Sequence, residues 1–236
     1  KHGVELKIED DGRMFPISNS SQTIIDCFLE ATGKLGIKVL TGQSVQSIYK
    51  AESHWKIDTQ NENYATEKLV LATGSNPKIW EMLQEKGHAI ISPVPSLFTF
   101  NIKDPRIKEL PGVAAQVTVN VKDTKLESTG PLLITHWGMS GPAILKLSAW
   151  GARTLFDKNY QFTIFVNWLN DVDTEDAEKI LKDLKQEHAK KAVSKKSPFD
   201  FPNRLWESLV LASEIEAETK WADLSKIQLQ NLANQL

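Results

Sequence analysis

The sequence contains one cysteine, Cys27, in 236 residues. A single cysteine excludes a disulfide framework and a cysteine-rich metal site, and it suits a reducing compartment, so we expect a cytoplasmic protein. No apolar run approaches the roughly 18–20 residues of a membrane-spanning helix, and we expect no membrane partner. The first residues are polar and charged, which does not fit a signal peptide.

The sequence has no large excess of positive or negative charge, because its 28 Lys and Arg residues nearly balance its 30 Asp and Glu residues. A net charge of −2 lacks the basic excess of a nucleic-acid-binding protein, so we expect no nucleic-acid partner. A local basic run at residues 185–196 is interpreted as a solvated helix face and loop, since aromatic residues are not interleaved there.

Several catalytic motifs are absent from the sequence. There is no G-x-G-x-x-G, P-loop, H-E-x-x-H or EF-hand pattern, and the five histidines show no metal-ligand spacing. The stretch GMSG at residues 138–141 is similar to a nucleophile elbow, but Pro142 stands where that motif needs glycine. We interpret it as a strand-to-helix turn capped by Ser140, and a serine hydrolase remains a third-ranked alternative.

Residues 1–89 are expected to form an α/β domain. Apolar residues recur at helical spacing from Ile24 to Leu35, and Gly36 is placed to end that helix. The unbroken apolar run at residues 69–72 is typical of a strand buried on both faces of a parallel sheet. The other strand-like segments expected here lie at residues 37–40, 45–48 and 55–57, and after the turn at 61–63.

The sequence changes character near residue 90, where proline becomes frequent. Strand-like runs then follow one another with one short helix among them, which favours an antiparallel β-barrel at residues 90–172. Residues 173–236 are predicted to form a small helical domain, with helices that start after Asp173, Pro202 and Ser225. The expected barrel strands are 97–102, 116–121, 132–135 and 162–166.

Two segments of the first domain combine features that suit a ligand. The turn at residues 10–18 places an arginine and an aromatic residue before a helix, and arginine can neutralise a phosphate or an anionic ring. Small residues end the run at 69–74, and ligands of open α/β sheets bind outside the carboxyl ends of strands. An ordinary surface loop and a plain turn account for the two segments equally well.

Five stretches of the sequence carry a family resemblance. They are GVELKIEDDGRMFPIS at residues 3–18, LVLATG at 69–74, PVPSL at 93–97, THWGMSGP at 135–142 and WADLS at 221–225. Together, and in this order, they resemble bacterial FAD-dependent oxidoreductases described as NAD(FAD)-utilising dehydrogenases, which include aminoacetone-oxidase-like flavoproteins. The resemblance implies an FAD domain of the two-dinucleotide-binding type, interrupted by an inserted antiparallel β-barrel and a small helical domain.

The resemblance also assigns site residues. It implies that a Rossmann βαβ unit lies before Lys1 and a closing segment after Leu236, so this chain is expected to be the middle portion, inactive and without retained FAD on its own. The family's loop after the ATG residues is shortened here. The residues expected near the cofactor are Arg13, Phe15 and Pro16 at the flavin, Val45 at the adenine end, and Ala72, Thr73 and Gly74 along the cofactor.

These observations predict an FAD-dependent oxidoreductase that acts on a small molecule. NADH and NADPH both stay open as sources of hydride. No side chain is assigned as a catalytic acid or base, because the isoalloxazine carries out the hydride chemistry in a flavoenzyme. A non-enzymatic recognition module built from the barrel and the helices stays open as the alternative.

Overall fold

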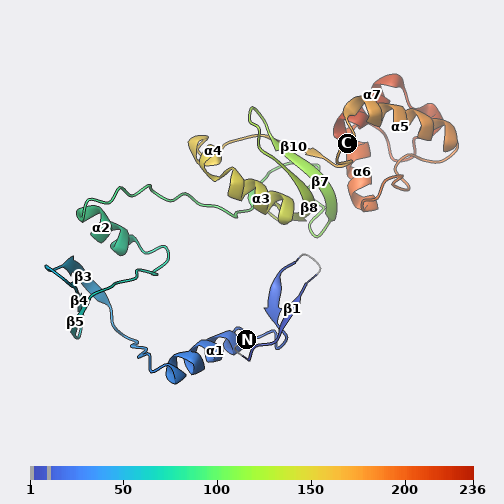
Figure 1. Cartoon of the computed structure of the whole chain (residues 1–236). Coiled ribbons are helices and arrows are strands. Elements are labelled where there is room, and N and C mark those ends of the chain that lie inside the picture. Colours follow the sequence, from blue (N-terminus) through green and yellow to red (C-terminus); the bar gives the residue numbers. More distant parts are fainter. Residues whose placement is uncertain (1–2, 10–11) are drawn as a thin grey trace. The chain divides into compact units, whose positions relative to one another are not determined.

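The computed structural model describes residues 3–9 and 12–236 and divides the chain into two compact units, Lys1–Ile91 and Ser92–Leu236 (Figure 1). Asp10 and Asp11, which belong to the turn expected to approach a ligand, lie outside the described residues. The sequence-based division into domains at 1–89, 90–172 and 173–236 stays a prediction.

The first unit opens with an antiparallel hairpin and a helix. The hairpin pairs β1 (Leu6–Ile8) with β2 (Met14–Pro16), and α1 (Ser21–Lys34) follows. The Ser20 hydroxyl accepts a hydrogen bond from the Gln22 N–H at the start of α1, and Gly36 after its end has φ of 68°. The helix is confirmed, but none of its residues, all of which are described, is buried.

A three-stranded meander and a second helix form the rest of this unit. The strands β3 (Val45–Lys50), β4 (Trp55–Thr59) and β5 (Asn63–Thr66) pair in this order, as the sequence predicts. The helix α2 (Pro77–Glu85) begins after Asn76, whose side chain accepts a hydrogen bond from the Lys78 N–H. Ile48 of β3 and Ile79 of α2 are both buried.

The expected parallel strand at residues 69–72 is not formed. This segment is irregular, and Val70 is 86% exposed. Residues 37–40 are likewise outside any strand, and Val39 is 55% exposed. A strand needs a neighbour that pairs with its N–H and C=O groups, and in the described part of this unit both sheets are antiparallel and exclude these segments. Apolar composition alone therefore does not create the strand.

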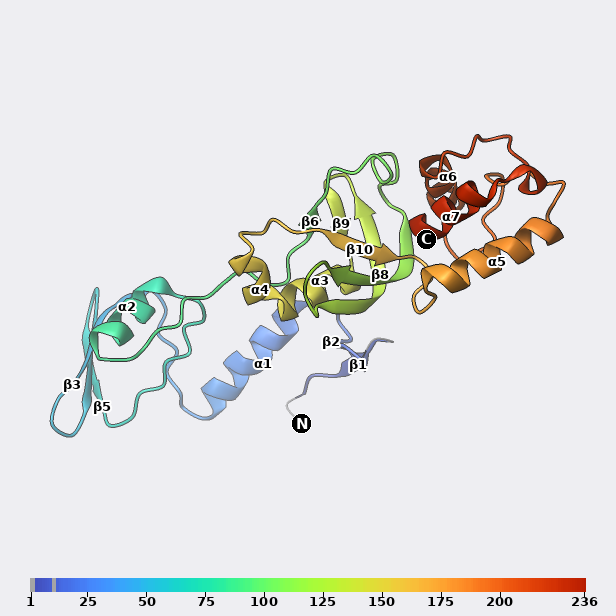
Figure 2. The ribbon, with the colours of Figure 1, turned by 90° about the horizontal axis from the view of Figure 1, so that it is seen from above.

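The second unit is built on a five-stranded antiparallel sheet (Figure 2). Its order is β10 (Ile164–Asn167), β7 (Ala114–Val121), β8 (Glu127–Thr135), β9 (Gly138–Ser140) and β6 (Phe100–Asn101). Helix α3 (Pro142–Trp150) packs against β7, β8 and β9, and α4 (Ala152–Asp157) follows it. The expected strands of this region are confirmed, with ends shifted by a few residues.

The stretch at residues 135–142 shapes this sheet. Ser140 pairs with Leu133 inside the sheet, and the residue that caps α3 is Gly141, so the expected Ser140 cap is wrong. A Cβ on Gly138 would lie 2.1 Å from the Phe100 backbone oxygen. A Cβ on Gly141 would lie 2.8 Å from the Pro131 backbone oxygen. Both glycines are required because neighbouring backbone approaches them closely, which explains the motif by packing rather than by a nucleophile.

Three helices follow the sheet: α5 (Thr174–Glu187), α6 (Asn203–Ala212) and α7 (Lys226–Gln235), with a 3₁₀ turn η1 (Trp221–Asp223) before α7. The predicted caps are confirmed, since Asp173 accepts from the Asp176 N–H and Ser225 forms a capping box with Gln228. Apolar character alone does not bury a residue of α7, because Ile227 is 71% exposed whereas Leu229 is buried.

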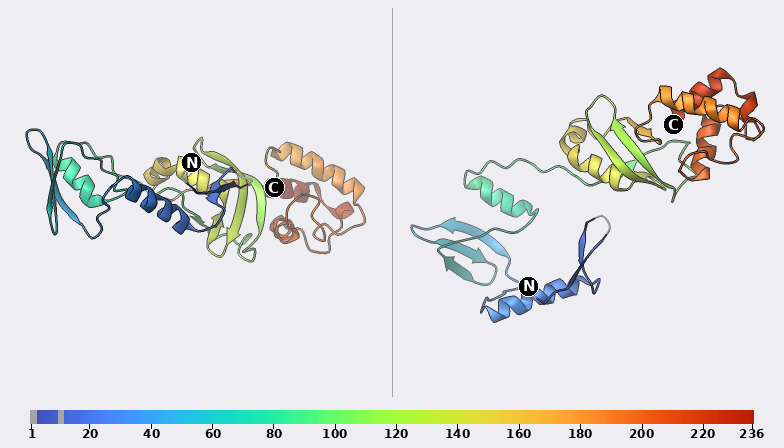
Figure 3. Two further views of the ribbon diagram at one scale, coloured as in Figure 1. Left: turned by 60° about the horizontal axis from the view of Figure 1, so that its bottom comes forward. Right: turned by 45° about the vertical axis from the view of Figure 1, so that its right-hand side comes forward.

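Figure 3 shows the sheet and the helices of the second unit as ribbons. Buried apolar residues of both parts belong to one cluster. Val117, Val119 and Leu132 of the sheet belong to the same buried cluster as residues of α5, α6 and α7. The Trp168 N–H after β10 also donates to the Leu236 backbone oxygen over 2.8 Å. The helical part is therefore linked to the sheet by shared buried residues and by this backbone hydrogen bond.

We expect Gly138→Ala to destabilise the second unit by about 2–4 kcal/mol, because the new methyl group would collide with backbone that cannot rotate away. Gly112→Ala is the matched control: Gly112 also has a positive φ, 87°, but a Cβ there meets no atom within 4 Å. It should cost about 1 kcal/mol. Urea unfolding followed by tryptophan fluorescence measures both, and equal losses would contradict the close-approach argument.

Candidate functional site

The hairpin of the first unit presents the predicted flavin residues. Arg13 precedes β2 and Phe15 lies two residues later, so their side chains project to the same face of the extended chain. The guanidinium carbon of Arg13 lies 5.5 Å from the centre of the Phe15 ring, a favourable cation–π distance. Pro16 pairs with Leu6 at the other end of the hairpin. Both Arg13 and Phe15 are exposed to solvent.

The segment of Ala72, Thr73 and Gly74 is exposed and leads into α2. Gly74 adopts φ of 60°, and a Cβ there would meet no atom within 4 Å. The Asn76 N–H donates to the Gly74 oxygen over 3.0 Å, which turns the chain into the helix. Val45 is half-buried at the start of β3, opposite Thr59.

The seven predicted cofactor residues therefore lie on three separate elements: the hairpin, the meander and the turn before α2. Their chemistry fits a flavin nucleotide. An exposed guanidinium beside an aromatic ring suits a phosphate or an anionic ring, and an open glycine backbone lets a flat ring approach. Their role toward FAD stays a prediction.

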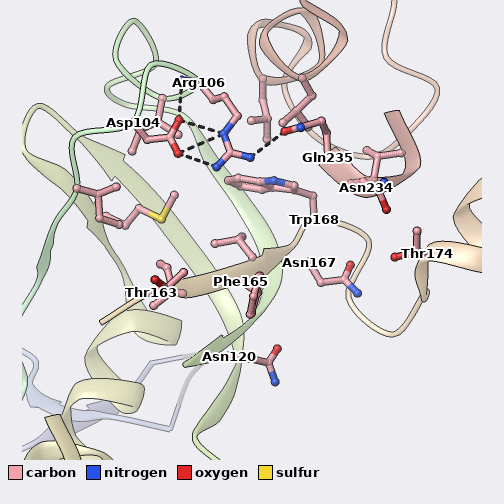
Figure 4. A pocket seen from close by; sticks show the side chains of 18 of the residues that line it. Asp104, Arg106, Asn120, Thr163, Phe165, Asn167, Trp168, Thr174, Asn234 and Gln235 are labelled. Atoms are coloured by element: carbon pink, nitrogen blue, oxygen red, sulfur yellow. Dashed lines mark hydrogen bonds and ion pairs between the residues drawn. The ribbon is translucent and has the colours of Figure 1, made fainter. Parts of the chain in front are cut away.

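Sequence reasoning did not identify a pocket of about 740 Å³ and mixed polarity in the second unit (Figure 4). It lies between the sheet, at β10, and the ends of α5, α6 and α7. Its walls mix amide, hydroxyl and aromatic side chains, and Phe165 in its wall is 57% exposed. Lining residues include Asn101, Arg106, Asn120, Phe165, Trp168 and Thr174.

Arg106 organises the rim of this pocket (Figure 4). Its Nε and one terminal nitrogen donate to the Asp104 carboxylate, at 3.0 and 2.6 Å, and its other terminal nitrogen donates to the Gln235 side chain at 2.8 Å. The Ser208 hydroxyl donates to the Arg106 backbone oxygen. The loop between β6 and β7 is thereby tied to α6 and α7.

The Asp104–Arg106 pair is charged over a wide pH range. Hydrogen bonds from the Arg106 side chain are the main cause that lowers the pKa of the Asp104 carboxyl, against the opposing effect of its partial burial. The guanidinium has five N–H groups, of which three are used in these bonds, so two can still donate to a ligand. The pocket can thus bind a flat polar group or an anion, while Asp104 is held as a carboxylate rather than a proton donor.

The sequence contains only one local feature that could have indicated this pocket. Asp104 and Arg106 are separated by one residue, but the contact from Arg106 to Gln235 spans 129 positions and depends on tertiary packing.

Among the described residues, no group of three or more His, Cys, Asp or Glu side chains is arranged to hold a metal ion. In the same part of the chain, no helix has the length and apolar character needed to cross a membrane.

Several curated proteins are similar in sequence to this chain. The chain is 26% identical over 226 residues to the ribosomal RNA dihydrouridine synthase of Escherichia coli, covering 91% of this chain and 54% of the relative. It is 22% identical to the protein of the same name from Haemophilus influenzae, covering 99% of this chain and 59% of the relative. A 3-dehydro-bile acid delta(4,6)-reductase of Clostridium scindens is 20% identical over 157 residues, 62% of this chain and 38% of the relative. The chain spans about half the length of the first two relatives.

These relatives correct the expectation of no nucleic-acid partner. Two of them are named for ribosomal RNA, so the exclusion of nucleic acid is wrong. It rested on the net charge of −2, which sums over the whole chain and says nothing about where the cations gather.

The Asp104–Arg106 pair generates a prediction about pH. A carboxyl whose pKa is lowered in the folded state stabilises it above the unfolded pKa of about 3.9, and this contribution is lost as the pH falls through the lowered value. Because the Arg106 side chain is 46% exposed, the contribution is about 0.5–1 kcal/mol. Asp104→Asn should therefore lower the free energy of unfolding at pH 7, and urea titrations should show the difference from the wild type shrinking as the pH falls below the unfolded pKa of about 3.9. A difference that does not depend on pH would contradict the charge assignment.

Two protein-family models match this chain, and their matched ranges overlap and together cover its whole length. The HI0933-like protein Rossmann domain matches residues 1–154, and the HI0933-like protein barrel and H2TH domain matches residues 94–236. The second match agrees with the antiparallel sheet and helices of the second unit. Each profile matches more than half of the chain, and the chain belongs to the HI0933-like family, a family of the FAD-binding flavoprotein type.

Proposed function

We propose that this chain belongs to an FAD-dependent oxidoreductase that reduces a uracil base in ribosomal RNA. The observation that carries the proposal is that both relatives aligned over nearly the whole chain are named ribosomal RNA dihydrouridine synthase. The family type and the exposed Arg13–Phe15 pair support FAD as the cofactor.

The reaction converts a carbon–carbon double bond into a single bond. In uridine, a hydride adds to C6 and a proton to C5, so the base gains two hydrogens and two electrons. When bound and first reduced by NADH or NADPH, the flavin would supply the hydride, and a proton would come from solvent. The third relative is named for a delta(4,6)-reductase, which is also a reduction of carbon–carbon double bonds. Its name supports the same class of chemistry on a different substrate.

Arg13 would hold negative charge on the cofactor, either a phosphate or the reduced ring. Its position over Phe15 restricts the side chain, so less freedom is lost when the cofactor binds. The open backbone at Gly74 would lie beside the flat ring, where a side chain would keep the ring away.

The pocket beside Arg106 would bind a nucleotide of the RNA. The exposed ring of Phe165 offers a stacking face, and Arg106 retains two N–H donors for a phosphate or a base carbonyl. Neither group transfers a proton, so the pocket is proposed to bind and orient the RNA.

The test is deletion of the gene that encodes the chain, followed by mass spectrometry of the ribosomal RNA. We expect one dihydrouridine to disappear and the wild-type gene to restore it. Arg13→Ala should lower the restored amount about tenfold or more, since one charge-assisted hydrogen bond contributes about 1.5–3 kcal/mol. Lys56→Ala is the matched control, because Lys56 also lies 5.9 Å from an aromatic ring, that of Tyr49, but on the meander.

Two outcomes would contradict the proposal. Unchanged dihydrouridine in the deletion strain would exclude this RNA reaction. A purified full-length protein that takes up no added FAD would favour the non-enzymatic recognition module instead.

A further inference from the structure

The connection between α5 and α6 carries a concentrated positive charge. From His188 to Phe199 the sequence contains four lysines and no Asp or Glu. All four lysine side chains are exposed. We call residues 189–197 the lysine loop; its lysines are Lys190, Lys191, Lys195 and Lys196.

The backbone of the lysine loop is held in place by the helical part of the second unit. Val193 at its centre is fully buried, and its N–H donates to the Thr219 oxygen over 2.9 Å. Its own oxygen accepts a hydrogen bond of 2.7 Å from the Trp206 indole N–H. Trp206 in turn stacks on buried Trp221, with ring centres 6.2 Å apart.

Further hydrogen bonds fix both ends of the loop. The Trp221 N–H donates to the Lys191 oxygen, and the Ala222 N–H donates to the Ala189 oxygen, each over 3.0 Å. Toward α6, the Ser197 N–H donates to the Asn203 side chain over 2.7 Å. No aromatic residue lies between these lysines in the sequence. Instead, Trp206 and Trp221 contact the loop backbone through hydrogen bonds. A fixed backbone lowers the entropy lost when its side chains bind a partner.

Within the part of the chain that the structure describes, no carboxylate neutralises the lysine charges. Among the described residues, none of the four lysines forms an ion pair with a carboxylate. Lys191 contacts the His188 ring at 3.3 Å. The facing segment carries Glu216 and Glu218, but these two carboxylates also form no ion pair within the described chain.

We infer that the lysine loop binds phosphates of the RNA substrate. The inference rests on the proposed function, which supplies RNA as the partner. Exposed lysines on a fixed backbone act as point charges toward phosphodiester oxygens and carry no base specificity. The loop would therefore position the RNA, while reduction takes place elsewhere.

The experiment measures RNA binding by the full chain rather than reduction. Fluorescence anisotropy with a labelled single-stranded RNA oligonucleotide is recorded over a series of salt concentrations. The test variant carries Lys→Gln at positions 190, 191, 195 and 196. The control variant carries Lys→Gln at four other exposed lysines of the second unit, positions 108, 122, 125 and 146, with the same change in net charge.

We expect the loop variant to bind RNA about 10- to 100-fold more weakly at low salt. Its slope of log affinity against log salt should fall by about 2–3, since each lost single-strand phosphate contact removes about 0.7. The control variant should retain most of the affinity and the slope. Lys→Arg at the four loop positions should also retain binding, and thermal unfolding should show that all variants fold.

Three results would overturn the inference. If both Lys→Gln variants weaken binding equally, the lysine loop has no special role, while the proposed RNA reaction still stands. If polyglutamate competes as well as RNA at equal charge, the loop is a site for acidic protein instead. If the wild-type chain binds no RNA at low salt, the loop inference fails, and the deletion experiment decides the proposed function independently.

Discussion

The second unit depends on one continuous apolar core. Strands β7 and β8 bury Val117, Val119, Leu132 and Ile134 on the face that α3 covers, and the same buried cluster extends through α5, α6 and α7. Because apolar burial contributes most of the favourable free energy of folding, removing the helices would expose part of this core. The pocket beside Arg106 and the lysine loop are both held in place by elements that contribute to this core.

The first unit, unlike the second, leaves apolar residues of its first helix exposed. Its helix α1 is well capped by Ser20 and followed by Gly36 in the left-handed conformation, yet Phe28 is 67% exposed. Local capping chemistry determines where a helix starts and ends, but it does not supply a surface for the apolar face. The predicted cofactor residues lie in this unit, on backbone that is open to approach at Gly74.

Two kinds of basic group are distinguished by their surroundings. Arg106 is tied to Asp104 and Gln235, and it organises a pocket of mixed polarity. The four lysines of the loop have no carboxylate partner within the described residues, while the loop backbone is held by hydrogen bonds. A flat nucleotide suits the first environment and a phosphate chain suits the second, which is why the two sites are proposed to act on one RNA.

The sequence by itself determined the local features of this protein. The helix starts after Asp173 and Ser225 were predicted correctly, because capping depends on residues three or fewer positions apart. The alternating strands of the second unit were predicted for the same reason, since their period of two is local. Only the tertiary structure decided that residues 69–72 form no strand, that Ile227 faces solvent and that Gly138 is required by the backbone of Phe100. It also decided that Arg106 meets Gln235 and that buried tryptophans support the lysine loop. Each of these depends on a partner distant in the chain, and a local residue pattern contains no information about which partner that is.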